Sequence, residues 1–101
     1  MSYRLTPKAQ EGFLRIAIQA QDRFGLEVAE RVLDKLEHAF ELLASSPGIG
    51  HTREDLTAVP GVLFWPVGPT LVAYRARRDH IEVLFVERGE LNWEELIERE
   101  L

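Results

Sequence analysis

The sequence predicts an α+β fold in which an antiparallel helical hairpin packs on a small antiparallel sheet. Three observations predict this fold. Two consecutive segments up to residue 45 carry apolar residues at the three- and four-residue spacing of helices. Beyond residue 60 the apolar residues instead form three short runs separated by turn residues, which is typical of strands. A chain of 101 residues has room for one core, so residues 1–101 are expected to form one domain.

The chain opens with a short apolar-flanked stretch at residues 3–5, which we expect to form a strand. Thr6 and Pro7 then supply a hydroxyl N-cap and a proline at the first helical position. An apolar stripe follows at helical spacing, formed by Ala9, Phe13, Ile16, Ala20 and Phe24. Leu14 and Ile18 lie off this stripe, so either the buried face is wide or a second face meets a partner.

Gly25 is expected to end the first helix as its C-terminal cap. A second helical stripe follows, formed by Ala29, Val32, Leu33, Leu36, Phe40 and Leu43. The opposite side is a charged, solvated face made of Glu27, Glu30, Arg31, Asp34, Lys35, Glu37 and Glu41. Two helices joined by so few residues must lie antiparallel, as an αα-hairpin.

Helix-breaking residues at 45–50 end the second helix, and a polar loop is expected up to residue 61. Three strands joined by tight turns are then predicted at 62–67, 71–76 and 81–86. They form an antiparallel meander, joined in the sheet by the opening strand. Because the apolar runs are nearly continuous, both faces of the sheet are expected to be covered, one of them by the hairpin.

A short helix is predicted at the end of the chain. Asn92 is a favourable N-cap, and Glu95 three residues later completes a capping box. One apolar face is formed by Trp93, Leu96, Ile97 and Leu101. A helix this short is marginal alone, so this face must dock on the domain or on a partner.

The charge balance favours a protein partner over a nucleic acid. Asp and Glu outnumber Lys and Arg by 17 to 12, giving a net charge of −5, whereas proteins that grip nucleic acid usually carry a cationic surplus. No cysteine is present, which excludes disulfides and thiolate catalysis. No secretory signal or membrane-length apolar run is recognised, so a cytoplasmic protein with no membrane partner is expected.

Three stretches of the chain carry a family resemblance. Residues 46–56 (SPGIGHTREDL) are similar to a P-G-x-G-x-x-R-x-D-L loop, and residues 64–75 contain the elements of an F-x-V-G-x-x-L-V-x-Y-R strand pair. Residues 79–83 (DHIEV) match a D-x-I-E-I strand. In this order and spacing they resemble the RelE/ParE toxin family of type II toxin–antitoxin systems, and lie closer to the ParE branch.

The resemblance implies a growth-inhibiting toxin of the plasmid-stabilization type, neutralised by a cognate ParD-like antitoxin. ParE-like members inhibit DNA gyrase, which makes gyrase the expected target. RelE-like members instead cut mRNA in the ribosomal A site, so a ribosome-dependent mRNA endonuclease is the alternative. A non-toxic interaction module that retains the fold is the second alternative.

RNA cleavage requires a base, an acid and cations around the phosphate. The resemblance places a family arginine near Leu63 and a family histidine at Glu87, so nuclease residues of the RelE type are missing and enzymatic activity is not expected. The catalytic candidates that remain are Arg53, Arg75 and Arg88. Simpler interpretations are local ion pairs, Arg53 with Asp55 and Arg75 with a glutamate across the sheet.

Large aromatic residues and arginine dominate protein interfaces. The predicted partner-binding residues are therefore Leu14, Ile18, Trp65, Tyr74, Arg75, Arg88 and Trp93. A tryptophan on a strand is more often part of the core, and the exposed hairpin residues could belong to a broader core face. His51 has no second histidine in register, so no metal site is expected, and no cofactor is implied.

Overall fold

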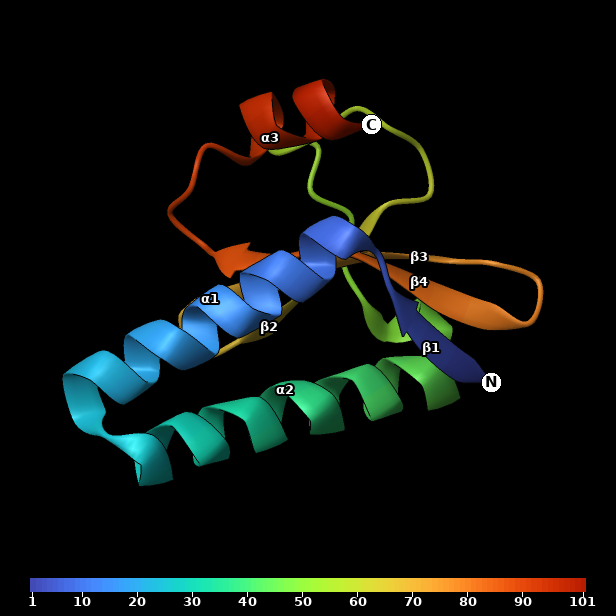
Figure 1. The fold of residues 1–101 in the computed structure, drawn as a ribbon. Coiled ribbons are helices and arrows are strands. Elements are labelled where there is room, and N and C mark those ends of the chain that lie inside the picture. Colours follow the sequence, from blue (N-terminus) through green and yellow to red (C-terminus); the bar gives the residue numbers. More distant parts are fainter.

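A computed structural model describes all 101 residues (Figure 1). In chain order the elements are β1 (Ser2–Leu5), α1 (Pro7–Phe24), α2 (Leu26–Ser45), a 3₁₀ turn (Pro47–Ile49), β2 (Leu63–Val67), β3 (Thr70–Ala76), β4 (His80–Arg88) and α3 (Trp93–Glu100). The predicted α+β fold and every predicted helix and strand are confirmed. No helix combines the length and apolar composition that crossing a bilayer requires.

The four strands form one sheet in the order β1-β4-β3-β2. Strands β2, β3 and β4 make the predicted antiparallel meander, but β1 runs parallel to β4, so the sheet is mixed rather than antiparallel throughout. The parallel orientation carries the chain directly from β1 into α1 along the edge of β4. Thr6 follows this path, because its backbone N–H and its hydroxyl donate to the carbonyls of Val83 and Leu84 at 3.0 and 2.8 Å.

Helix α1 covers the part of the β4 edge that β1 leaves unpaired. Gly12 is buried against this edge, and a Cβ atom at this position would overlap the carbonyl oxygen of Val86. One turn further on, Arg15 forms an ion pair with Glu87 at 2.8 Å. An open strand edge can template pairing with another chain, so the close approach of α1 protects β4 from such pairing.

The molecule has three layers, with the sheet between the helical hairpin and α3 (Figure 1). Alternate residues of β3 face opposite layers. Val72 and Tyr74 belong to the core under the hairpin, whereas Leu71 and Ala73 belong to the core under α3. The expectation that both faces of the sheet are covered is therefore confirmed, and the second cover is the C-terminal helix.

Both predicted helix starts are confirmed. The hydroxyl of Thr6 accepts from the Ala9 N–H at 3.1 Å, and the Asn92 side chain accepts from the Glu95 N–H at 3.2 Å. The side-chain amide of Asn92 also donates to the Glu95 carboxylate at 3.4 Å, so the two side chains are joined to each other, and the predicted bond from the Asn92 backbone N–H to Glu95 that would complete a capping box is not formed. These local bonds explain why short sequence signals located the helix ends.

Two residues of the predicted apolar faces are exposed. Phe24 is 65% exposed and Leu101 is 50% exposed. Phe24 lies in the last turn of α1, where the connection between α1 and α2 extends beyond the ends of the strands (Figure 1). Leu101 is the residue after α3. The apolar face predicted for each of these helices therefore continues beyond the residues that pack on the sheet.

Candidate functional site

Each of the three candidate catalytic arginines is held by a nearby carboxylate. The pairs are Arg53 with Asp55 at 2.8 Å, Arg75 with Glu82 at 2.8 Å, and Arg88 with Glu90 at 2.6 Å. The local ion pairs expected for Arg53 and Arg75 are therefore present. Hydrogen bonding from Arg75 holds the pKa of Glu82 below its usual value.

The arginines on the sheet do not converge on one point. Arg75 lies opposite Glu82 near the β3–β4 turn, whereas Arg88 lies opposite Thr70 at the other end of the same strand pair. Thr70 and Arg75 are five residues apart on β3, which corresponds to roughly 17 Å of extended strand. The two side chains are thus each paired with a carboxylate at opposite ends of the strand pair and do not meet at one point.

The two positions where family nuclease residues are missing have structural roles. Leu63 is half-buried and packs against the core under the hairpin. Glu87 accepts two hydrogen bonds from Arg15, at 2.8 and 3.1 Å, and so ties α1 to the end of β4.

Two of the predicted partner-binding residues are core residues, which corrects the expectation that they contact a partner. Tyr74 is 0% exposed and Trp93 is 1% exposed. Trp93 packs edge-on against Phe64 and Phe85 and donates its indole N–H to the Arg88 carbonyl at 3.0 Å. Aromatic residues occur at these two positions because each large ring packs into the core on one face of the sheet.

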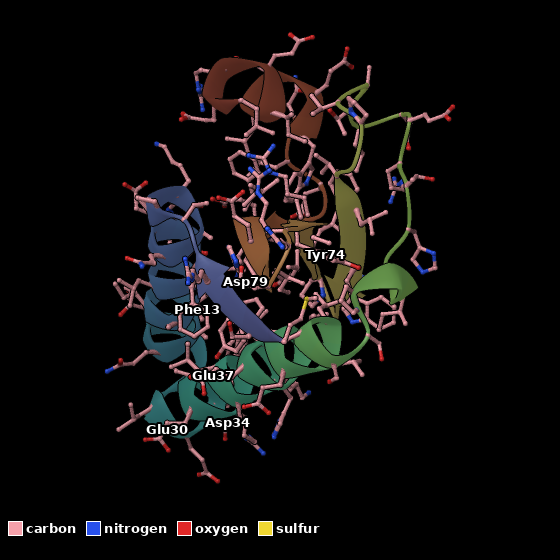
Figure 2. All side chains as sticks on the ribbon, turned by 90° about the vertical axis from the view of Figure 1, so that its right-hand side faces the viewer. Phe13, Glu30, Asp34, Glu37, Tyr74 and Asp79 are labelled. Carbon is pink, nitrogen blue, oxygen red and sulfur yellow. The ribbon has the colours of Figure 1, made fainter.

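Tyr74 also anchors the loop that follows α2 (Figure 2). Its hydroxyl donates to the Pro47 carbonyl at 2.7 Å and accepts from the Gly50 N–H at 2.9 Å. Burial raises the pKa of the Tyr74 hydroxyl above its usual value. Gly50 lies so close to the phenol ring that a side chain there would overlap it. The family-like loop motif and the strand tyrosine are thus parts of one structural unit.

The other predicted partner-binding residues remain at the surface. Trp65 is half-buried on β2 and stacks on His51, with ring centroids 6.0 Å apart. Leu14 and Ile18 are each 59% exposed. At 3.6 residues per turn, they lie on roughly the opposite side of α1 from Ile16 and Ala20, which face inward. They form an outer apolar face of the hairpin.

A groove of about 400 Å³ lies on the inner side of the hairpin, between its connection and the β2–β3 turn. Its apolar lining includes Ile16, Ala20, Phe24, Val28, Val32 and Val67. Of the predicted site residues, only Arg88 lines this groove, together with two further cations, Arg23 and Lys35. The sequence pattern did not indicate the groove, because it places Lys35 on the solvated face of α2 and Phe24 in the core.

The outer side of α2 carries acidic residues, whereas the groove has a cationic lining. Figure 2 labels Glu30, Asp34 and Glu37 along this helix. Together with burial, Glu37 and Glu41 raise the pKa of the Tyr3 hydroxyl. The acidic surplus of the chain therefore lies partly on the solvated face of α2, and the groove on the inner side keeps a cationic lining.

The fold and these surfaces define a class: a small α+β domain with a cationic apolar groove, an exposed apolar face on its hairpin and dispersed arginines. The chain matches, over residues 3–93, the family described as the ParE toxin of the type II toxin–antitoxin system parDE. It belongs to this family. The resemblance drawn from the sequence motifs is thereby confirmed.

Characterised relatives agree with this assignment. The chain is 32% identical over 68 residues to toxin ParE3 of Caulobacter vibrioides, a match that covers 67% of this chain and 66% of that toxin. It is 33% identical over 73 residues to toxin ParE1 of Mycobacterium tuberculosis, covering 72% of each. A solved chain of a chromosomal ParDE toxin–antitoxin system from P. aeruginosa has a TM-score of 0.75 at 24% identity, covering 89% of this chain and 97% of that one. This last likeness concerns the fold.

Proposed function

We propose that this ParE-type toxin arrests bacterial growth by binding DNA gyrase in the cytoplasm and is neutralised by a ParD-type antitoxin. The observation that carries the proposal is the family match across residues 3–93, in a family described by its parDE system. ParE-like proteins are gyrase inhibitors, as the sequence resemblance implies. The solved structure with the same fold likewise comes from a ParDE pair.

The distribution of charged residues supports binding over RNA cleavage. The net charge of −5 disfavours a polyanionic substrate. The arginines that cleavage would use are separated along the sheet and paired with carboxylates. A protein target that is recognised by surface contact fits these features better than an mRNA held for in-line attack.

We further propose that the outer apolar face formed by Leu14 and Ile18 contacts a protein partner of the toxin. Two large aliphatic side chains, each more than half exposed and one helical turn apart, form a row that a second protein can cover. Both side chains are off the core stripe, so polar replacements leave the fold intact. A surface contact can therefore be tested separately from stability.

The proposal is tested by expressing the chain in a bacterial host, alone or together with the product of the adjacent open reading frame. We expect the chain alone to cause loss of viable cells, filamentation and an SOS response, and co-expression to restore growth. Normal growth of cells that accumulate the folded chain would contradict the proposal and support a non-toxic interaction module. Growth arrest with cleaved A-site codons and no SOS response would instead indicate the endonuclease alternative.

The outer face is tested with the double variant Leu14→Asn/Ile18→Asn. We expect this variant to lose toxicity or antitoxin binding while it keeps the helical circular dichroism spectrum of the parent. Leu42→Asn is the matched control, because Leu42 is also an exposed leucine, 45% accessible, but lies near the far end of α2. Full toxicity and full antitoxin binding of the double variant would exclude this face from both contacts.

A further inference from the structure

The end of the sheet where β1 begins and β3 turns into β4 has an unusual charge for this chain. It holds four of the 12 basic residues of the sequence but only two of the 17 acidic ones. Its net charge is therefore +2, which leaves −7 on the rest of a chain whose total is −5. We call this set the arginine tip; its basic members are Arg4, Arg75, Arg77 and Arg78, and its acidic members are Asp79 and Glu82.

The strand register brings the members of the tip together. Arg4 on β1 and Arg75 on β3 both lie opposite Glu82 on β4, so one carboxylate is flanked by arginines from both neighbouring strands. The two arginines are thus about 10 Å apart across three strands. Tyr3 packs against the core under the hairpin, so the next side chain along the strand, that of Arg4, projects from the opposite face of the sheet.

The two carboxylates do not neutralise the tip. Glu82 is shared between two arginines, at 2.8 and 3.1 Å. Asp79 is bonded to the ring of His80 at 2.8 Å. Neither Arg4 nor Arg78 forms an ion pair, and both are exposed. The tip therefore keeps an excess of positive charge for an anionic partner.

The tip is an ordered projection of the sheet. β3 and β4 stay paired as far as Ala76 and Ile81, and a bond from the Arg77 N–H to the His80 carbonyl at 2.8 Å closes the turn beyond them. Figure 1 shows this turn extending past the helices, at the far end of the sheet from the connection between α1 and α2. All the cations of the tip are arginines, whose planar guanidinium groups can each bind two oxygens of a phosphate. A row of anionic groups can therefore reach several of them at once.

The composition of the tip favours the phosphate backbone of a duplex over other anionic partners. Residues 75–80 contain no exposed large apolar side chain, whereas protein interfaces are usually anchored by such residues. The only ring there is that of His80, whose side chain is 15% exposed, so the tip has no platform on which single-stranded bases could stack. Contacts to duplex phosphates need neither feature, because cations and hydrogen-bond donors make them. The span of roughly 10 Å between Arg4 and Arg75 also matches three phosphate steps of about 3.4 Å along one DNA strand.

We propose that the arginine tip binds the phosphate backbone of duplex DNA, the substrate of gyrase, so that the toxin contacts the enzyme and its DNA together. The contact with both at once rests on the proposed function, whereas DNA binding by the tip rests on its own charge and geometry. Because the rest of the chain is negative, free DNA is bound weakly and in one orientation. The contact strengthens when gyrase holds the chain and the DNA side by side.

The test measures binding of the purified full-length chain to a fluorescently labelled DNA duplex at about 50 and about 200 mM salt. Contacts from the three exposed arginines Arg4, Arg77 and Arg78 predict a slope of roughly −2.7 in log K against log salt, a roughly fortyfold loss over this range. The double variant Arg77→Gln/Arg78→Gln should bind at least about tenfold more weakly at the lower salt, with a slope of roughly −0.9. The matched control Arg31→Gln/Arg99→Gln removes the same charge from exposed positions of α2 and α3 and should bind within about twofold of the parent.

Absence of binding by the parent at the lower salt, or equal binding by the parent and Arg77→Gln/Arg78→Gln, would overturn the inference without involving gyrase. A double variant that binds DNA as the parent does, but binds DNA-free gyrase more weakly, would assign the tip to an acidic protein surface and also overturn it. If the parent binds DNA through the tip but leaves gyrase uninhibited, the proposed target is wrong and DNA binding by the tip is upheld. Thermal unfolding of every variant verifies that it is folded.

Discussion

Replacing Gly12 by alanine tests the packing of α1 against β4. In most helices this change stabilises a protein by about 0.5–1 kcal/mol, because glycine loses more backbone entropy on folding. Here the added methyl group would overlap the carbonyl oxygen of Val86, a backbone atom of the β4 edge that α1 covers. The helix or the strand must therefore move, which reverses the sign of the expected effect.

The magnitude follows from two opposing terms. Overpacking a close contact costs typically about 1–3 kcal/mol, and the gain in helix propensity offsets less than about 1 kcal/mol of it. A shift of α1 also lengthens the Arg15–Glu87 ion pair, now 2.8 Å, which contributes under about 1 kcal/mol at a partly exposed site. The net loss is about 2 kcal/mol, equivalent to a fall of roughly 8–16 °C in the melting temperature of a domain this size.

Equilibrium urea unfolding and thermal unfolding, both followed by circular dichroism, measure this loss. The matched control is Gly48→Ala, since Gly48 has a negative φ and a methyl group added there would have no heavy atom within 4 Å. We expect the control to remain within about 0.5 kcal/mol of the parent. A Gly12→Ala protein as stable as the parent, or more stable, would refute the close approach of α1 to β4.

Three further substitutions test other contacts of the fold. Tyr74→Phe removes the phenol that holds the loop after α2 and should lower the free energy of unfolding by about 1–3 kcal/mol in urea titrations; an unchanged midpoint would contradict the anchor. Trp93→Ala should cost about 3–5 kcal/mol and expose the sheet face to a hydrophobic dye, and no dye binding would argue against the docked α3. Because Arg75 lowers the pKa of Glu82 in the folded state, the carboxylate adds stability above the usual glutamate pKa of 4.5, and this stability is lost as the pH falls through the folded value. Glu82→Gln should thus be less stable than the parent by under about 1 kcal/mol at pH 7, and this difference should shrink in acid; a difference independent of pH would exclude the ion pair as its source.

Much of the fold could be predicted because its signals are local. Thr6 and Asn92 cap their helices through side-chain bonds to the third following residue, so a few letters of sequence identify each helix start. The direction of β1 could not be predicted in this way. It depends on the hydrogen bonds that Thr6 donates to the carbonyls of Val83 and Leu84 in β4, which lie 77 and 78 residues later in the chain. No local sequence pattern indicates such a distant contact.

The candidate site was predicted less well, for two physical reasons. Residue type does not distinguish an aromatic ring in the core from one in an interface, so the prediction that Tyr74 and Trp93 contact a partner was wrong, since both are buried. The groove arises because α1 and α2 extend beyond the sheet, which depends on the relative lengths of separate elements. Only the exposed pair Leu14 and Ile18 was recognisable from helical spacing alone.

We propose above that the chain acts by occupying the surface of a protein target. A supercoiling assay with purified DNA gyrase, the purified chain and its antitoxin tests this claim most directly. We expect the chain to inhibit supercoiling in proportion to its concentration and the antitoxin to reverse the inhibition. Undiminished supercoiling by gyrase in the presence of an excess of folded chain would contradict the claim.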